Sequence, residues 1–365
     1  MPLENVIQTV ENCRYCLMCR HIAPVEQVTH KESYSPHGWG LLIASVRRGL
    51  LDWDEDTVEA IYSAPDSGNS RAHCVTGQPL PEAIAAVRAE IVDHKLAPSI
   101  VYQLEESFKK WSTPFAERAP QPRSGTGESA LLVGDEALYL WPEALEASLK
   151  LLKSAGVEPV LIGRGRNNGY LASSLGLRER AVELAKANLD ELEASGATRM
   201  FVLSPGDYFT FHQLYDERLG IQWPSEVELL EVVPFLAEKL VARALNLSKG
   251  EDPGSYAYVD PTHAVRVPGR HDSPRTLVEA ILPAHRKELF WRRERAHPVG
   301  STALQFTRPG IAEKLTAARI EDARSRGAIL LVSEDPGTLY QLSRQAGKGG
   351  VEVQGLYELL AGHLA

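Results

Sequence analysis

The sequence lacks several features that would assign it to a class at once. It has no apolar run of the roughly 18 residues that a membrane span needs, and no basic segment followed by an apolar one at its start. It also lacks an excess of positive charge, since its formal net charge is -9. We therefore expect no transmembrane helix, no secretory leader and no nucleic acid partner. The expected location is the cytoplasm, or the inner face of a membrane reached through partners.

Cysteine is scarce, and its distribution is uneven. The chain has four cysteines in 365 residues, and three of them fall within seven residues. Disulfides do not explain this crowding, because bonds between such close neighbours close small, strained loops that gain little from loop entropy. Cys13, Cys16 and Cys19 form a C-x2-C-x2-C run, whereas Cys74 stands alone. A run with this spacing can present three thiolates to different irons of one cubane cluster.

The continuation of the run predicts which cluster is kept. In bacterial ferredoxins the run continues with three residues, a cysteine and a proline, and that fourth cysteine ligates the other cluster. Here the fourth position is Ala23, followed by Pro24. If Cys74 is the last cysteine of a second run, the other three positions of that run hold Ala64, Ser67 and Ser70. The sequence then predicts that the second cluster is lost and that one complete [4Fe-4S] ligand set remains: Cys13, Cys16, Cys19 and Cys74.

Two other interpretations of the cysteines stay open. A zinc site could use three cysteines with a fourth thiolate, or with His21 or His73, which lie close by in the sequence. Four structural thiols without any metal would be exposed and reactive. The charged residues beside the cysteines either favour the reduced cluster or are solvated loop residues; they are Arg14, Arg20, His21 and His73.

The rest of the chain predicts a division into units. Residues 1–110 carry all the cysteines, and residues 111–127 are rich in Pro, Ser, Gly and Arg, as a linker would be. From residue 128 onward strands and helices alternate. The stretches 128–245 and 246–365 repeat one order of helix, Gly-Ala, apolar strand and Pro-Gly, which predicts a duplicated βα unit with a small parallel sheet in each half.

The pattern of apolar residues also predicts individual elements in the two halves. The expected strands are 130–133, 157–162, 200–203, 256–259 and 329–332. The expected helices are 142–154, 177–195 and 309–326.

Taken together, these motifs resemble a known family of iron–sulfur subunits. Its members have an N-terminal two-cluster, ferredoxin-like helical domain followed by two cysteine-rich CCG repeats. Glycolate oxidase iron–sulfur subunits and the matching subunit of anaerobic glycerol-3-phosphate dehydrogenase are examples, and heterodisulfide reductase subunits share the parts. The resemblance covers nearly the whole chain, including the segment 32–38 and the acidic stretch 52–56. It implies an α-helical ferredoxin-like domain followed by an α/β domain of two duplicated CCG-like repeats.

The C-terminal half departs from the family pattern, because every cysteine there is replaced. The family's cysteine positions match Gly134-Asp135, 167–169 and 204–207 in the first repeat, and 260–263, 297–300 and 335–338 in the second. Chemistry that needs thiols is therefore not expected in this half. It is either a scaffold, or it keeps a pocket for a small molecule, cofactor or metal. Such a pocket would be lined by Asp135, Asn167, Asn168, Asp207, Asp260, His263, His297 and Asp335.

The resemblance implies an electron-transfer subunit of a flavin-dependent dehydrogenase that acts on a hydroxy acid or a related small alcohol. FAD is expected on a partner subunit and not on this chain, and the electrons would pass through the cluster to a quinone or another carrier. No catalytic residue is expected on this chain. The side chains between the ligands, Tyr15, Leu17 and Met18, are the expected contacts with the partner. The alternative is a non-redox scaffold or regulatory subunit with a structural cluster or zinc.

Overall fold

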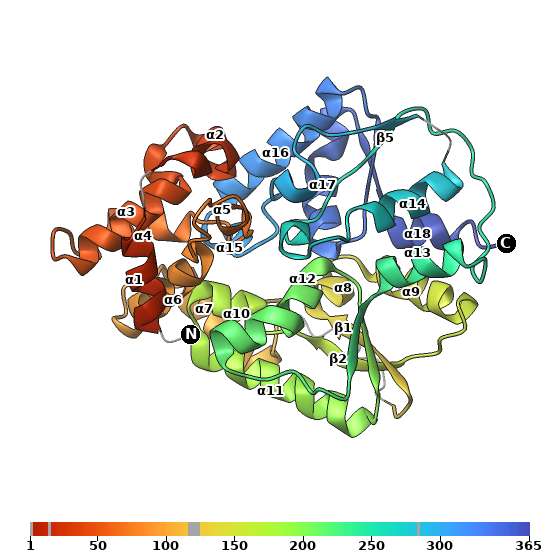
Figure 1. Cartoon of the computed structure of the whole chain (residues 1–365), viewed down its shortest axis with the longest axis horizontal. Helices are drawn as coiled ribbons and strands as arrows, with labels where there is room; N and C mark the ends of the chain where they lie inside the picture. The colour runs from red at the N-terminus through yellow and green to blue at the C-terminus, as the bar shows by residue number, and fades with distance from the viewer. Residues whose placement is uncertain (1–2, 14–15, 116–124, 283–284) are drawn as a thin grey trace.

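A computed structural model of the chain describes residues 3–13, 16–115, 125–282 and 285–365. Figure 1 shows a helical region on the left, drawn in red and orange, and two α/β units on the right, drawn in green and blue. No helix within these described ranges is both long enough and apolar enough to cross a bilayer.

Short helices make up the N-terminal region, which contains no strand in its described residues. Several of these helices begin at sequence signals. Ser35 accepts a hydrogen bond from the Gly38 N–H at the start of one, and Asp54 and Thr57 form a capping box at the start of the next. The elements are α1 (Leu3–Glu11), η1 (Met18–Ile22), α2 (Pro24–Thr29), η2 (Glu32–Tyr34), α3 (Pro36–Arg47), α4 (Glu55–Tyr62), α5 (Asn69–Ala72), α6 (Leu80–Asp93) and α7 (Ser99–Trp111).

The first α/β unit contains a four-stranded sheet in the order β2-β1-β3-β4, with all pairs parallel. Parallel strands need crossover connections, and helices supply them. The elements are β1 (Ser129–Gly134), α8 (Asp135–Tyr139), α9 (Pro142–Ser154), β2 (Val160–Arg166), α10 (Tyr170–Leu175), α11 (Arg178–Ser195), β3 (Arg199–Val202), α12 (Pro205–Phe209), the π-helix η3 (Thr210–Leu219), β4 (Glu228–Glu231) and α13 (Val232–Val241).

The second unit repeats this arrangement with a parallel sheet in the order β6-β5-β7-β8. Its elements are β5 (Tyr256–Tyr258), η4 (Ala264–Arg266), α14 (Asp272–Ile281), β6 (Arg286–Lys287), η5 (Arg293–Arg295), α15 (Leu304–Thr307), α16 (Pro309–Ser325), β7 (Leu330–Ser333), α17 (Pro336–Gly349), β8 (Glu352–Gly355) and α18 (Leu356–Ala361).

Two glycines mark equivalent places in the two units. Gly169 and Gly300 both have a φ of +94°, a backbone conformation that side chains other than glycine strongly disfavour. A Cβ atom on Gly169 would lie 3.0 Å from the Ala181 oxygen, and one on Gly300 would lie 2.7 Å from the Ala312 Cα. Each glycine thus lets a loop press against the long helix that follows it. The shared strand order and these glycines are consistent with duplicated βα repeats.

The local sequence pattern placed the long elements well. The helix expected at 142–154 is α9 with those bounds, and the expected helices at 177–195 and 309–326 match α11 and α16 within one residue. All five expected strands are present, although β2 begins three residues later than predicted. The edge strands β4, β6 and β8 were missed. They have two to four residues each and are at most partly buried along most of their length, so their apolar signal is weak.

Part of the expected linker is packed against the first unit. The Asn167 N–H donates to the Ser112 carbonyl oxygen at 2.8 Å, and the buried Thr113 hydroxyl donates to Asp135 at 3.3 Å. Residues 116–124 lie outside the described residues. The division into units at residues 1–110, 111–127, 128–245 and 246–365 stays a prediction.

Arg88 joins the helical region to the first α/β unit. This arginine on α6 is only 1% exposed. Its guanidinium donates to the carbonyl oxygens of Ile61, Ala64 and Ser174 at 2.8 Å each. Three carbonyl acceptors offset the cost of burying the charge, so the two regions share one interior instead of meeting only at a wet surface.

A buried carboxylate connects all three parts of the chain. Asp66, in the loop between α4 and α5, is bound by the Arg218 guanidinium through two bonds of 2.8 and 2.9 Å. Arg266 of the second unit donates to the same carboxylate at 2.7 Å. Although burial opposes ionisation, Arg218 and Arg266 hold the pKa of Asp66 well below its usual range. Glu82 lies 3.6 Å from Arg266 and balances the second positive charge.

We expect Asp66→Asn to lower the free energy of unfolding by about 3 kcal/mol, because it leaves two buried guanidinium groups without their main counter-charge. Urea unfolding followed by circular dichroism measures the loss. The matched control is Asp56→Asn, which removes an exposed carboxylate from the same region and should change stability by less than about 1 kcal/mol. Equal effects of the two substitutions would contradict this role of Asp66.

Candidate functional site

The two cysteine runs lie side by side in the helical region. Cys13 follows the end of α1, and Cys19 lies within η1, whose first turn is preceded by Leu17 in the left-handed conformation (φ 59°). Cys74 follows α5, which packs against η1. The rings of His21 and His73, one from each run, are 6.1 Å apart. All four cysteines have free thiols.

The electrostatic effects on Cys19 show that the four cysteine sulfurs lie near one another. Burial, together with the nearby sulfurs of Cys13, Cys74 and Cys16, raises the pKa of Cys19 to about 11. Four clustered thiolates repel one another unless positive charge lies between them. Without metal the Cys19 thiol therefore keeps its proton at neutral pH, and a metal centre would have to displace it.

Cys74 sits in a cradle of hydrogen-bond donors. Its sulfur lies 3.4 Å from the Thr76 hydroxyl. Partial burial opposes ionisation of this thiol, but the Thr76 hydroxyl and the backbone N–H groups of Gln78, Thr76 and Gly77 outweigh it, so the pKa is lowered. Donors of this kind stabilise a thiolate and tune a cluster that it ligates.

Three of the four positions predicted for a second ligand set line one small cavity. Ala64, Ser67 and Ser70 line it together with Ile22 and Pro24, the two neighbours of the fully buried Ala23. The cavity measures about 20 Å³, which is room for about one water molecule. The fourth position, Ala23, lies in the chain between two of the lining residues, so all four predicted positions lie beside this small cavity.

The backbone of the second run keeps the geometry of the first. Leu17, directly after Cys16, and Gly68, directly after Ser67, both have positive φ and both precede a short helix. A shared left-handed residue at equivalent positions supports the alignment of the two runs. This alignment is the one that predicts Cys74 as the fourth ligand beside the first run.

Several residues near the cysteines already have partners. Arg20 lies 3.4 Å from Glu26 and 3.6 Å from Glu32. The His73 Nε2 lies 2.6 Å from the Glu294 carbonyl oxygen, so His73 helps to fix the second run against the second α/β unit. Arg14 and Tyr15 lie outside the described residues.

Across the described chain, no three His, Cys, Asp or Glu side chains are arranged to hold one metal ion. A zinc ion needs all its ligands within about 2.0–2.3 Å of one point. A cubane spreads its ligands over four separate irons and so needs a wider arrangement. The thiols and the hydrogen-bond donors of this site fit the chemistry of such a cluster.

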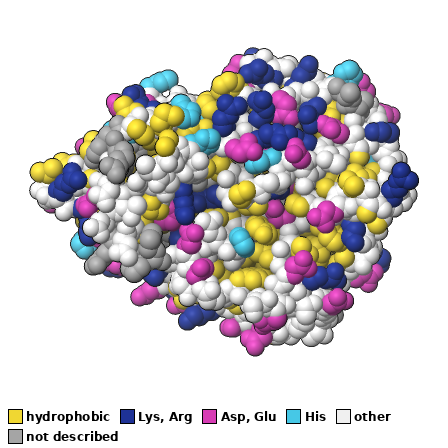
Figure 2. Space-filling view, in the orientation of Figure 1, with side chains coloured by type: hydrophobic (Ala, Val, Ile, Leu, Met, Phe, Trp, Pro, Cys, Tyr) yellow, Lys and Arg dark blue, Asp and Glu magenta, His cyan; other side chains and the backbone are white. Residues whose placement is uncertain are grey.

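Apolar side chains around the cysteines are exposed. Leu17 is 40% exposed, Met18 is 48% and Val75 is 76%. Figure 2 shows apolar side chains gathered beside histidines on the upper part of the helical region. The sequence pattern pointed to Leu17 and Met18 but missed Val75, whose position directly after Cys74 was the available signal.

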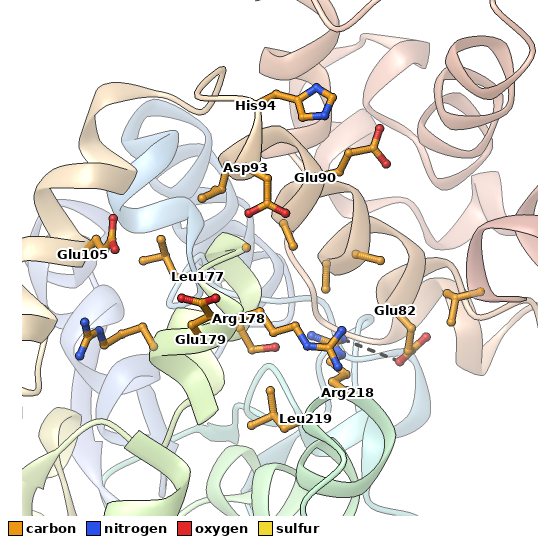
Figure 3. A pocket seen from close by; sticks show the side chains of 18 of the residues that line it. Glu82, Glu90, Asp93, His94, Glu105, Leu177, Arg178, Glu179, Arg218 and Leu219 are labelled. Carbon is orange, nitrogen blue, oxygen red and sulfur yellow. Dashed lines mark ion pairs between the residues drawn. The ribbon is translucent and has the colours of Figure 1, made fainter. Parts of the chain in front are cut away.

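A larger cavity of about 440 Å³ lies between α6 and the first α/β unit. Figure 3 shows its lining, in which Glu90 and Asp93 lie near His94, and Glu179 lies nearer to Arg178 and Arg218. The ion pair between Glu82 and Arg218, at 3.8 Å, closes its inner end. This mixture of charges does not favour one kind of ligand.

A smaller cavity of about 60 Å³ lies where the two α/β units meet, at the carboxyl ends of their strands. It gathers six of the eight residues that the sequence proposed for a pocket: Asp135, Asn167, Asn168, Asp207, His263 and Asp335. Asp260 is instead bound by Arg275 at 2.8 and 2.9 Å. His297 stacks on Trp291 with ring centroids 3.8 Å apart and lines a different cavity.

The carboxyl groups of this cavity are held close together. Burial raises the pKa of Asp207 to about 7 and that of Asp135 to about 6. Burial, with the nearby charges of Asp335, Asp135 and Asp207, also raises the pKa of Glu136 well above its usual value. Sequence reasoning missed Glu136, because it follows Asp135 at the start of an ordinary helix and carries no local signal of its own.

Comparison with known proteins finds distant relatives. No family model matches the chain. It is 24% identical over 222 residues to one subunit of the dihydromethanophenazine:CoB–CoM heterodisulfide reductase of Methanosarcina acetivorans, covering 59% of this chain and 54% of that protein. It is 28% identical over 228 residues to a probable glycolate oxidase iron–sulfur subunit of Bacillus subtilis, covering 60% and 49%. The chain is thus distantly similar to subunits of oxidoreductases, and it spans about half the length of these curated relatives.

A solved structure shares the fold. The crystal structure of a hypothetical protein from Helicobacter pylori matches with a TM-score of 0.60 at 13% sequence identity, over 99% of this chain and 76% of that one. The match supports a mixed α/β architecture in which a helical region is followed by two parallel sheets.

We expect Asp207→Asn to stabilise the protein at alkaline pH. The folded-state pKa of Asp207 is raised to about 7 from 3.8, so the native protein loses stability as pH rises through that range. The variant has no proton to lose at this position. Its melting temperature relative to wild type should therefore rise by a few degrees between pH 5.5 and 8.5 in amine-free phosphate buffer.

Asp190→Asn, which removes an exposed carboxylate on α11, serves as the control and should show no such trend. A pH-independent difference between Asp207→Asn and wild type would contradict the raised pKa.

Proposed function

We propose that this protein is an iron–sulfur electron-transfer subunit with one [4Fe-4S] cluster on Cys13, Cys16, Cys19 and Cys74. The observation that carries the proposal is the sorting of the two ligand sets. One complete set of thiols lies in a single neighbourhood, while the four positions of the other predicted set lie beside a separate, small cavity. The distant similarity to a protein named as a glycolate oxidase iron–sulfur subunit supports the same conclusion.

The cluster would supply a centre that accepts and releases one electron at a time. The chain's own residues hold and adjust it. The cradle of Cys74 favours the thiolate form, and burial of Cys19 keeps part of the site away from water. Cys16 is exposed, so the site reaches the surface, where an electron can pass to or from a partner.

A partner must supply the two-electron chemistry. Oxidation of a hydroxy acid or a related small alcohol removes two electrons, which a flavin can take and then release singly. We place FAD on that partner subunit and assign no catalytic residue to this chain. Electrons would leave for a quinone or another carrier, in the cytoplasm or at the inner face of the membrane.

We expect anaerobically purified protein to be brown and to contain about four irons per chain. Changing any one of Cys13, Cys16, Cys19 or Cys74 to Ala should remove most of the iron and destabilise the helical region, because ligand binding and folding are coupled. Iron analysis and visible absorbance measure both effects.

Ser70→Ala is the matched control for these variants, because it changes a position of the lost ligand set and should leave the iron content unchanged. A full, stable cluster in Cys74→Ala would overturn the ligand assignment. A colourless protein with about one zinc per chain would favour the scaffold instead.

We expect the exposed apolar residues beside the cysteines to contact the flavoprotein. A Leu17→Glu, Met18→Glu double variant should weaken complex formation at least tenfold, because it places two charges in a surface that must lose its water. Co-purification and substrate-driven reduction of the cluster measure the effect in the complex with its natural partner.

Leu50→Glu is the control, since Leu50 is 71% exposed and lies just beyond α3, away from the cysteines. Two results would show that the partner binds elsewhere. One is that Leu50→Glu weakens complex formation as much as the double variant does. The other is a double variant that keeps a normal iron content and forms the complex as well as the wild type.

A further inference from the structure

The small cavity between the two α/β units has features that the electron-transfer role does not use. The strands β1, β3 and β7 each direct their carboxyl end toward it, and its lining comes from both units. In open α/β sheets this is where ligands bind. Its volume of about 60 Å³ has room for about four water-sized groups.

The cavity is acidic and has no internal counter-charge. Asp135, Glu136, Asp207 and Asp335 all line it, and none of them forms an ion pair within the described ranges of the chain. Their hydrogen-bond partners are neutral: the Asn167 amide donates to Asp135 at 2.9 Å, and the Asn168 amide donates to Asp207 at 2.8 Å. Carboxyl groups this close must either keep protons or be neutralised by a bound cation.

Glycines allow this close approach. A Cβ atom on Gly337 would lie 2.7 Å from an oxygen of Glu136, and one on Gly206 would lie 3.1 Å from the His263 ring. Side chains at these two positions would fill the space that the carboxylate and the imidazole occupy. Glycine at these two positions therefore leaves room for the Glu136 carboxylate and the His263 ring.

Buried polar groups without partners provide a second, independent sign of a ligand site. His263 is 8% exposed, and its Nδ1 has no hydrogen-bond partner. Thr302 is 2% exposed, and its hydroxyl has none either. Both residues line this cavity, although buried polar groups normally find partners.

The imidazole of His263 is held in place by aromatic rings. The ring of Tyr170 meets it edge to face at 4.6 Å, and that of Phe209 stacks on it at 5.8 Å. Burial lowers the pKa of His263 to about 3, with Arg266 adding to the effect. The ring is thus neutral and keeps one nitrogen as an acceptor for a donor on a ligand.

We propose that this cavity binds a small organic ammonium ion, a primary amine of about four heavy atoms with a polar group at its other end. The ammonium would lie among the carboxylates of Asp135, Glu136, Asp207 and Asp335. Its three N–H donors reach acceptors in different directions. A bare metal ion instead needs acceptors that converge on one point, and no three described acidic, histidine or cysteine side chains do so.

A hydroxyl group at the other end of the ligand would lie beside His263 and Thr302. Their unpartnered side-chain atoms can accept a hydrogen bond from it or donate one to it. The limit on binding energy per atom places the dissociation constant of such a ligand at roughly tens of micromolar or weaker.

Ethanolamine is the probe, titrated into the full-length protein in amine-free phosphate buffer and followed by calorimetry. Ethylene glycol, which has the same size but no charge, is the control ligand. We expect saturable binding of one ethanolamine per chain at pH 8 and none of ethylene glycol. Binding should be at least tenfold weaker at pH 5.5, because the raised pKa values of Asp207 (about 7) and Asp135 (about 6) favour their protonated forms there. His263 stays neutral over this range. Burial raises the pKa of Asp335 against the opposing effect of the nearby charge of Arg270, which stays charged.

Two nearly isosteric variants test the site. Asp207→Asn and Glu136→Gln should each weaken ethanolamine binding at least tenfold at pH 8, whereas Asp190→Asn should leave it unchanged. Circular dichroism confirms that the variants fold. Iron content provides a separate readout, so failure of this proposal and failure of the cluster assignment are distinguishable.

Three outcomes would overturn the proposal. The first is the absence of saturable ethanolamine binding at pH 8. The second is binding that ethylene glycol matches or that neither variant weakens. The third is binding of one Mn²⁺ per chain that both variants abolish and ethanolamine cannot displace, which would make the cavity a metal site.

Discussion

The structure depends on the burial of one carboxylate between two arginines. Asp66 lies in the second cysteine run, between the replaced positions Ala64 and Ser67, and it binds Arg218 of the first α/β unit and Arg266 of the second. A lone charge at this depth would be strongly unfavourable, so each partner holds the others in place. The three parts of the chain are therefore joined at the position predicted for a second cluster.

These buried contacts would suit the proposed electron-transfer role. Electron transfer requires that the centre keep a fixed distance from its donor and acceptor. Arg88 and Asp66 both tie the helical region to the α/β units through buried contacts, and His73 ties the second cysteine run to the second unit. The residues near the proposed cluster are thus supported from both α/β units, while Leu17, Met18 and Val75 remain exposed.

The α/β half carries oxygen and nitrogen groups at positions where the resemblance to iron–sulfur subunits implies thiols. Where related proteins are expected to carry thiols, this chain carries carboxylates and amides, and the fold still gathers them at the carboxyl ends of its strands. Thiolates bind soft metals, whereas oxygen acceptors prefer hard cations or hydrogen-bond donors. The two repeats, marked by the equivalent Gly169 and Gly300, thus present oxygen acceptors where the resemblance to iron–sulfur subunits implies thiols.

The sequence by itself determined the repeated order of long helices and strands, and it predicted which cysteines share one cluster. Both follow from short-range spacing, because apolar periodicity defines α9, α11 and α16, and the C-x2-C-x2-C run limits how far apart three sulfurs can lie. Only the tertiary structure decided the rest. Asp66 is 152 residues from Arg218 and 200 from Arg266, and Asp135, Asp207 and Asp335 come from two different sheets. A single sequence carries no local signal for such pairs, because their interaction energy exists only once distant segments have been brought together and water has been excluded.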